Sequence, residues 1–165
     1  MPRYEYYNTG DDGSDWIRDV YWDAQTFTVG ADGHTVTSIK LLLYREGSPG
    51  TVTVSIRATD VDGHPTGADL TVGTIDGNTI GPTTAAWYEI ALTEYMLSAN
   101  TKYAIVVRLL IGDSLHTVAW RHDGTSPTYA DGNNEYSSDS GDTWTSNTAK
   151  DRMFEVWGPG PWAHL

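Results

Sequence analysis

The stretch "TVTVSIRAT", residues 51–59, indicates the fold class of this protein. Its even positions are apolar and its odd positions are polar, with Val52, Val54, Ile56 and Ala58 alternating with Thr51, Thr53, Ser55 and Arg57. A period of two is typical of a β-strand with one buried face. We therefore expect a strand over 51–59 that packs against a hydrophobic core.

Other segments are similarly rich in Val, Ile, Thr, Tyr and Trp, and they cover residues 24–29, 38–46, 87–92, 102–111, 116–122 and 152–158. Between them lie turn sequences dense in Gly, Asp, Asn and Pro. No segment has a convincing helical period. With a first strand near the N-terminus, this pattern predicts an all-β antiparallel β-sandwich, jelly-roll-like, of about eight strands.

Three regions follow from this pattern. Residues 1–21 are expected to form an N-terminal arm and the first strand, and residues 22–157 the β-sandwich domain. Residues 158–165, "GPGPWAHL", are expected to form an extended tail, because their two prolines lack amide donors.

Aromatic and apolar side chains at the two ends suggest assembly contacts. Tyr4 and Tyr6 fall on one face of an extended strand, and Trp162 and Leu165 lie in the tail. The tail either folds back on its own domain or anchors on a neighbouring subunit or capsid surface, where a Trp can dominate the binding energy.

Charge and composition exclude several classes of partner. The 165 residues carry 10 basic and 22 acidic side chains, a net charge of −12, which disfavours nucleic acid. Cysteine is absent, so no disulfide framework is expected. The longest apolar run, 104–111, is too short to span a bilayer, and the N-terminus has no classical signal peptide, so we expect no membrane insertion.

One tetrapeptide suggests hydrolase chemistry. Residues 112–115 read Gly-Asp-Ser-Leu, as in the GDSL hydrolases, but they join two expected strands and no helix follows. The only Asp-x-x-His, Asp113 to His116, overlaps the motif and is not expected to serve as an independent base and orienter. We therefore predict a hairpin loop, no catalytic residues and no enzymatic activity.

The turns are rich in potential metal-binding oxygens. The segment 60–69 begins like a calcium loop, but its glycine is misplaced and no closing Glu follows, which favours a plain turn. Asp11, Asp12 and Asp15 form a second acidic group, and the five histidines lack metal-ligand spacing. No metal site or cofactor is predicted, although these loops leave room for a structural Ca²⁺ ion.

The aromatic residues are the most informative feature. The chain has seven Trp and ten Tyr against two Phe, an excess of rings that stack on sugars or dock on proteins. Tyr129, Tyr136 and Trp144 lie in the loop-rich stretch 123–147. If sugar is bound, we predict a site that holds Trp120, Arg121, Tyr129 and Trp144.

The segment "SSDSGDTW", residues 137–144, resembles the Asp-box, a hairpin motif best known from sialidases. The resemblance implies that Asp139 accepts backbone hydrogen bonds across the turn, that Gly141 takes a conformation others avoid, and that Trp144 packs beneath. These roles are structural, so the segment predicts a β-hairpin over 137–145 and no catalysis.

A second resemblance covers residues 22–157. Val52–Ile56 running into an Asp-x-x-Gly-x-Pro-x-Gly turn at 60–67, and Leu-x-Ala-Asn-Thr-x-Tyr at 97–103, resemble the choice-of-anchor-like modules of phage tail and virion proteins and of prokaryotic surface proteins. Such modules are β-sandwiches used for binding and assembly, without shared catalytic residues.

Two functions are therefore expected. The first is a structural, decoration or adhesion component of a phage-like virion or another extracellular assembly, which self-associates or binds a capsid or tail protein. The second is a carbohydrate-binding module that uses loop aromatics. Both place the protein on a virion or an extracellular surface.

Overall fold

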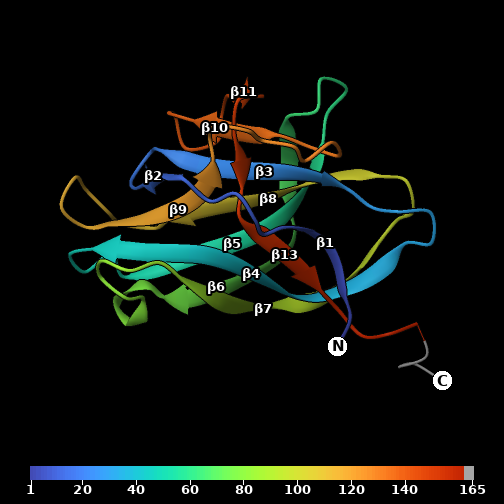
Figure 1. Ribbon diagram of the computed structural model, residues 1–165, viewed down its shortest axis with the longest axis horizontal. Helices are drawn as coiled ribbons and strands as arrows, with labels where there is room; N and C mark the ends of the chain where they lie inside the picture. The colour runs from blue at the N-terminus through green and yellow to red at the C-terminus, as the bar shows by residue number, and fades with distance from the viewer. Residues whose placement is uncertain (162–165) are drawn as a thin grey trace.

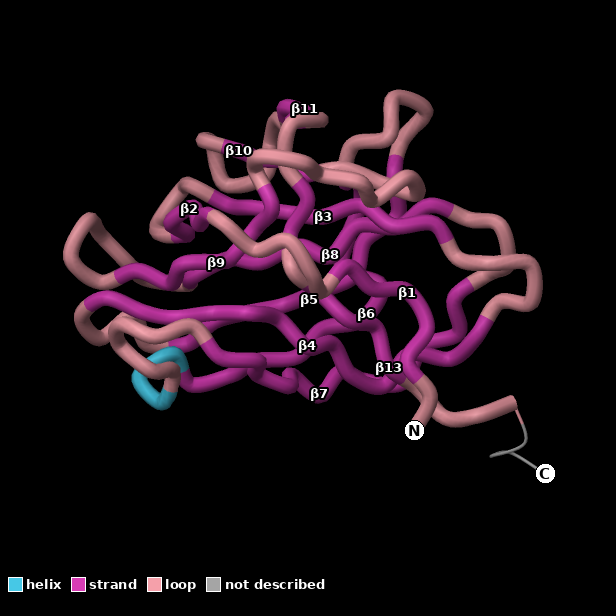
Figure 2. The backbone as a smooth tube through the Cα atoms, in the orientation of Figure 1, coloured by secondary structure: helices cyan, strands magenta, loops and turns pink. Residues whose placement is uncertain are grey.

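The structure, a computed structural model, describes residues 1–161 and consists of two antiparallel sheets packed face to face (Figures 1 and 2). This confirms the predicted β-sandwich. The strands are β1 (Arg3–Tyr7), β2 (Gly13–Ile17), β3 (Trp22–Thr28), β4 (His34–Glu46), β5 (Thr51–Thr59), β6 (Pro65–Asp76), β7 (Ala86–Leu97), β8 (Lys102–Leu109), β9 (Thr117–Asp123), β10 (Asn134–Ser137), β11 (Thr145–Asn147), β12 (Asp151–Arg152) and β13 (Phe154–Trp157). A single 3₁₀ turn, η1 (Gly77–Thr79), follows β6.

Strand β4, the longest of the described strands, pairs with three other strands of the seven-stranded sheet. On one side it pairs with β7, and on the other it pairs first with β13 and then with β9. Strand β1 lies beyond β13, while β2 and β12 both pair with β9. The six-stranded sheet has the order β11-β10-β3-β8-β5-β6.

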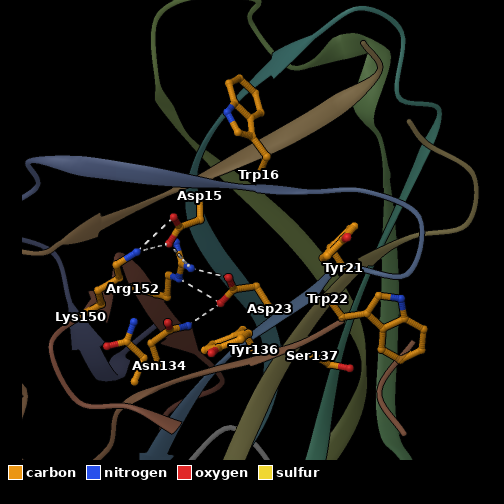
Figure 3. Close-up of a pocket in the computed structure, with 11 residues that line it drawn as sticks. Asp15, Trp16, Tyr21, Trp22, Asp23, Asn134, Tyr136, Ser137, Lys150 and Arg152 are labelled. Atoms are coloured by element: carbon orange, nitrogen blue, oxygen red, sulfur yellow. Dashed lines mark hydrogen bonds and ion pairs between the residues drawn. The ribbon is translucent and has the colours of Figure 1, made fainter. Parts of the chain in front are cut away.

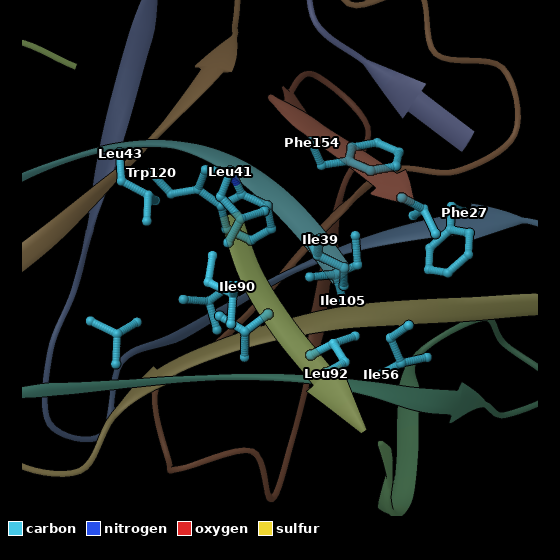
Figure 4. Packing of buried hydrophobic residues seen from close by; sticks show 14 of the residues in the cluster. Phe27, Ile39, Leu41, Leu43, Ile56, Ile90, Leu92, Ile105, Trp120 and Phe154 are labelled. Atoms are coloured by element: carbon cyan, nitrogen blue, oxygen red, sulfur yellow. The ribbon is translucent and has the colours of Figure 1, made fainter. Parts of the chain in front are cut away.

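The hydrophobic core fills the space between the two sheets (Figure 4). Val52, Val54 and Ile56, which the alternation of 51–59 predicts to be buried, are fully buried, as are Ile105 and Val107 of the apolar segment 102–111. They meet Ile39, Leu41, Leu43 and Trp120 of the opposite sheet. The period-two reading is thus confirmed at the centre of the fold.

Residues 1–161 form thirteen strands where the sequence predicts about eight. The additional ones are mostly short and polar, as in β10, β11 and β12, and they lie in stretches dense in turn residues. Their pairing satisfies backbone hydrogen bonds without burying an alternating apolar face, so the apolar period does not reveal them.

The two sheets approach each other closely along one side, where β6 meets β7. A side chain at Gly73 would lie 1.9 Å from the carbonyl oxygen of Ala91, and the Thr71 hydroxyl donates to the Thr93 carbonyl. The opposite side, where β2 and β12 face β3 and β10, is where the sheets separate and a cleft opens.

The N-terminal residues form an edge strand rather than a free arm. The Tyr4 hydroxyl donates to the Pro159 carbonyl at 2.7 Å, and the Gly158 amide donates to the Pro2 carbonyl. The tail therefore follows its own domain as far as Pro161. The predicted contacts Trp162 and Leu165 lie outside the described residues. Within residues 1–161, no helix is long and apolar enough to cross a membrane.

Candidate functional site: an aromatic cleft between the sheets

Trp120 does not fit its predicted role as a sugar-stacking residue. Its ring is fully buried between the sheets, and its indole N–H donates to the Met153 carbonyl at 2.9 Å. Strand β9 alternates, so Trp120 points into the core while Arg121 points outward. Stacking on a ligand requires an exposed ring face, and the prediction for Trp120 is therefore wrong.

Arg121 and Tyr129 are both engaged within the domain. The Arg121 guanidinium donates to Asp11 at 2.7 Å on the outer face of the seven-stranded sheet. Tyr129 is half-buried, with its ring edge-on to Phe154 at 5.3 Å, and burial raises the pKa of its hydroxyl. Neither side chain lies with Trp120 in a common binding site.

Trp144 packs on the outer face of the six-stranded sheet. With Trp22 it covers a small apolar cluster of Ala24, Ala104 and Val106. Its indole nitrogen is buried without a hydrogen-bond partner among residues 1–161. Of the four predicted ligand-binding residues, Trp120 therefore lies in the core and the other three lie in different parts of the domain, so they do not form one site.

The hairpin predicted from "SSDSGDTW" is present, because β10 and β11 pair on either side of residues 138–144. Asp139 accepts hydrogen bonds from the Thr143 amide and hydroxyl, and Gly141 has a φ of +85°. The Ser140 amide donates to the Val20 carbonyl, so this turn also contacts the β2–β3 turn.

Tyr4 and Tyr6 do not act together. The Tyr4 ring stacks on His34 with a centroid distance of 3.7 Å, whereas Tyr6 is exposed beneath the guanidinium of Arg3. A register shift within β1 separates the pairing of Arg3 from that of Tyr6. Of these two tyrosines, Tyr6 keeps the exposure that an assembly contact needs.

The GDSL tetrapeptide lies in the β8–β9 loop, as predicted. Asp113 Oδ1 and His116 Nδ1 lie 2.8 Å apart, so these two side chains pair with each other inside the loop. The pair is solvent-exposed, and within residues 1–161 no hydrogen bond joins Ser114 to His116. The Leu115 amide also donates to Asp113 Oδ1, so both hydrogen bonds stabilise the loop.

The acidic turns are satisfied by the protein itself. Asp60 accepts from the amides of Asp62 and His64, so its carboxylate bonds the backbone of its own turn. Asp12 accepts from the Gly124 amide, and Asp15 pairs with cations as described below. Among the described residues, no cluster of three or more acidic or histidine side chains is arranged to hold a metal ion.

A cleft opens between the sheets on the side opposite β6 and β7, with a volume of about 350 Å³. We call it the intersheet cleft. Its walls come from β2, the β2–β3 turn, the start of β3, the β10 hairpin and the segment that leads into β12. Its lining residues are Asp15, Trp16, Tyr21, Trp22, Asp23, Asn134, Tyr136, Ser137, Asn147, Lys150 and Arg152 (Figure 3).

Arg152 organises the floor of the intersheet cleft. Its side chain is 1% exposed, with Nε donating to Asp23 at 3.0 Å and Nη1 to the Trp120 carbonyl at 2.9 Å. Its Nη2 donates to both Asp23 and Asp15. The Asn134 amide also donates to Asp23. One buried guanidinium thus ties β12 to β2 and β3 by charge-assisted hydrogen bonds.

The two carboxylates of the floor differ in protonation behaviour. Burial raises the pKa of Asp23 to about 6, despite the attraction of Arg152. For Asp15, burial opposes ionisation, but Arg152 and Lys150 outweigh it and lower the pKa of the carboxyl. Both groups are therefore ionised at neutral pH, and the floor holds two anions against two cations.

Exposed aromatic rings border this floor. Tyr21, Tyr136 and Trp16 are 48%, 44% and 41% exposed. In Figure 3 the Tyr136 ring lies beside Asp23, its cross-strand neighbour, whereas Trp16 lies away from the charged groups. Trp16 is instead edge-on to Tyr44 at 5.3 Å. Flat apolar surfaces beside fixed polar groups are characteristic of small-molecule sites.

The sequence indicates Tyr136 as a surface ring but does not point to Tyr21, Asp23 or Arg152 as residues of a site. The available signal was local: a Trp, a Tyr and a second Trp at 16, 21 and 22, close to Asp15 and Asp23. The cleft itself depends on contacts between residues up to 137 positions apart, as in the bond from Arg152 to Asp15.

No family model and no curated protein matches the chain.

Proposed function

We propose that this chain is a non-catalytic adhesion module that binds carbohydrate in the intersheet cleft. The observation that carries the proposal is the pair of exposed rings, Tyr21 and Tyr136, beside a rigid polar floor. Sugars present an apolar ring face and a rim of hydroxyls, so they match a site that combines aromatic surface with fixed hydrogen-bonding groups.

The contacts of the same floor disfavour a catalytic role. Asp23 accepts from Arg152 and Asn134 and is almost fully buried, so it is poorly placed to transfer a proton to a ligand. The exposed pair Asp113 and His116 has no hydrogen-bonded nucleophile within the described chain. These contacts support binding without turnover.

The test is saccharide binding by paired variants. Tyr136→Ala and Tyr21→Ala should each weaken binding of any saccharide found on a glycan array by at least about tenfold, because each removes a ring surface of the size whose burial contributes ~1.5–3 kcal/mol. Tyr6→Ala is the matched control, since Tyr6 is 45% exposed and lies on β1, outside the cleft lining. Equal binding by wild type, Tyr21→Ala and Tyr136→Ala would contradict the proposal.

A second candidate is assembly into a phage-like virion or another extracellular structure, and the β8–β9 loop favours it. Leu110, Ile111 and Leu115 are strongly exposed in this one loop, and such grouped aliphatic side chains suit a protein contact. The resemblance to choice-of-anchor-like modules supports the same setting. Replacing Leu110 and Ile111 by Ser should abolish self-association or particle binding in sedimentation assays, and unchanged association would contradict it.

A further inference from the structure

The charges of the intersheet cleft are internally balanced. Lys150 Nζ lies 2.8 Å and 3.1 Å from the two oxygens of Asp15, and Arg152 binds both Asp15 and Asp23. Two cations and two anions therefore cancel within the lining, in a chain whose net charge is −12. The lining offers no unpaired cation to an anionic ligand.

Only part of this network is accessible to a ligand. Arg152 is buried, whereas the side chains of Asp15 and Lys150 are 38% and 28% exposed. Asp15 presents carboxylate oxygens that accept hydrogen bonds, and Lys150 has three N–H donors. Together they form a neighbouring acceptor and donor at the surface of the floor.

An adjacent pair of hydroxyls complements this arrangement. Each hydroxyl both donates and accepts, so one can donate to Asp15 while its neighbour accepts from Lys150. The hydroxyls of Tyr21 and Tyr136 make no hydrogen bonds to residues 1–161 and so remain available at the rim. A carboxylate or sulfate in the same place would instead face Asp15, and the two cations beside that carboxylate, Lys150 and Arg152, are already paired with it.

We infer that the intersheet cleft selects a neutral saccharide unit through two adjacent hydroxyls bound by Asp15 and Lys150, with its apolar ring surface against Tyr21 and Tyr136. The cleft discriminates against sulfated and carboxylated sugars. This inference rests on the proposed function, and it identifies Asp15 and Lys150 as the specificity-determining pair.

The experiment compares a neutral oligosaccharide with its sulfated and carboxylated counterparts on the same backbone, by calorimetric titration. The proteins are wild type, Asp15→Asn, Lys150→Met and the control Asp32→Asn, which removes one negative charge at an exposed turn outside the cleft. Thermal unfolding of each variant verifies that it is folded. If Asp15→Asn does not fold, the change in preference is tested with Lys150→Met.

Wild type should bind the neutral form at least about tenfold more tightly than either anionic form. Asp15→Asn should weaken neutral binding and shift the preference towards the anionic forms by about tenfold, because Lys150 loses its anionic partner. Lys150→Met should weaken neutral binding and leave the anionic forms excluded, and Asp32→Asn should match wild type.

Two outcomes overturn the inference while the proposed function stands: equal or tighter wild-type binding of an anionic form, or an unchanged preference in both Asp15→Asn and Lys150→Met. The proposed function itself fails, together with the inference, if wild type binds no member of the set or of a broad array, or if binding survives loss of both Tyr21 and Tyr136.

Discussion

Replacing Arg152 by Met should strongly destabilise the domain, because Arg152 neutralises the buried carboxylate of Asp23. In the variant, Asp23 keeps only the Asn134 amide, and its side chain is 8% exposed. Removing one partner of a buried ion pair costs ~3–5 kcal/mol, of a total stability of roughly 5–15 kcal/mol. For a domain of this size, that corresponds to a fall in Tm of about 6–20 °C.

The destabilisation should depend on pH in a defined direction. In the wild type, the folded-state pKa of Asp23 is about 6 against 3.8 for the free side chain, so stability falls as pH rises from 3.8 to 6. Without Arg152 the folded-state pKa of Asp23 rises further, which extends this loss of stability to higher pH. Arg152→Met should therefore be much closer to wild type at pH 5 than at pH 7.5.

The assay is urea unfolding followed by tryptophan fluorescence at both pH values. Arg121→Met is the matched control, because Arg121 also pairs with an aspartate but is 23% exposed, and such a surface pair contributes ~0–1 kcal/mol. The double variant Asp23→Leu/Arg152→Met should recover most of the lost stability, since an apolar pair replaces a buried ionic one. A loss below about 1 kcal/mol at pH 7.5, or one that does not shrink at pH 5, would refute this reasoning.

Three further predictions concern the core, a histidine and the GDSL loop. Val54→Asp should prevent folding, because it places an unpaired carboxylate in a fully buried position; circular dichroism of a folded variant would contradict this. Glu135, at 2.7 Å, raises the pKa of His64 above 6.5, so this pair should stabilise the fold below pH 6.5 and lose its effect as pH rises through the raised pKa. Urea midpoints of wild type should therefore fall over that range while those of His64→Leu stay flat, and parallel curves would count against the pair. Ser114→Ala should leave any weak ester hydrolysis unchanged, and loss of a robust activity in that variant would reverse the argument against catalysis.

The fold was predictable because its central strands bury side chains with a regular period. The alternation in 51–59 identifies which residues of β5 face the core, and every apolar side chain predicted there from 52 to 56 is fully buried. The same argument could not place Trp120 on the surface or in the core without knowing which face of β9 meets the opposite sheet.

The intersheet cleft was not predictable by such local patterns. Asp15 was read as one of three acidic turn residues, yet it pairs with Lys150 and Arg152, more than 130 positions away. Arg152 lies in a two-residue strand with no apolar period, and Asp23 is a charged residue inside a buried strand. The sequence shows composition and the period of its apolar residues. A site made of long-range ion pairs depends instead on the topology that brings its segments together.

The intersheet cleft separates the groups that hold it together from the groups available to a ligand. Arg152, Asp23 and Asn134 are buried and bonded to one another, so their positions are fixed before any ligand arrives. Tyr21 ends the β2–β3 turn and Tyr136 lies in β10, and the hydrogen bond from the Ser140 amide to the Val20 carbonyl joins the turn after β10 to the β2–β3 turn. Rings carried on backbone that is fixed in this way lose little freedom on binding, which preserves affinity. Substitutions of Arg152, Asp23 or Asn134 should therefore change stability first, whereas substitutions of the two tyrosines should change binding alone.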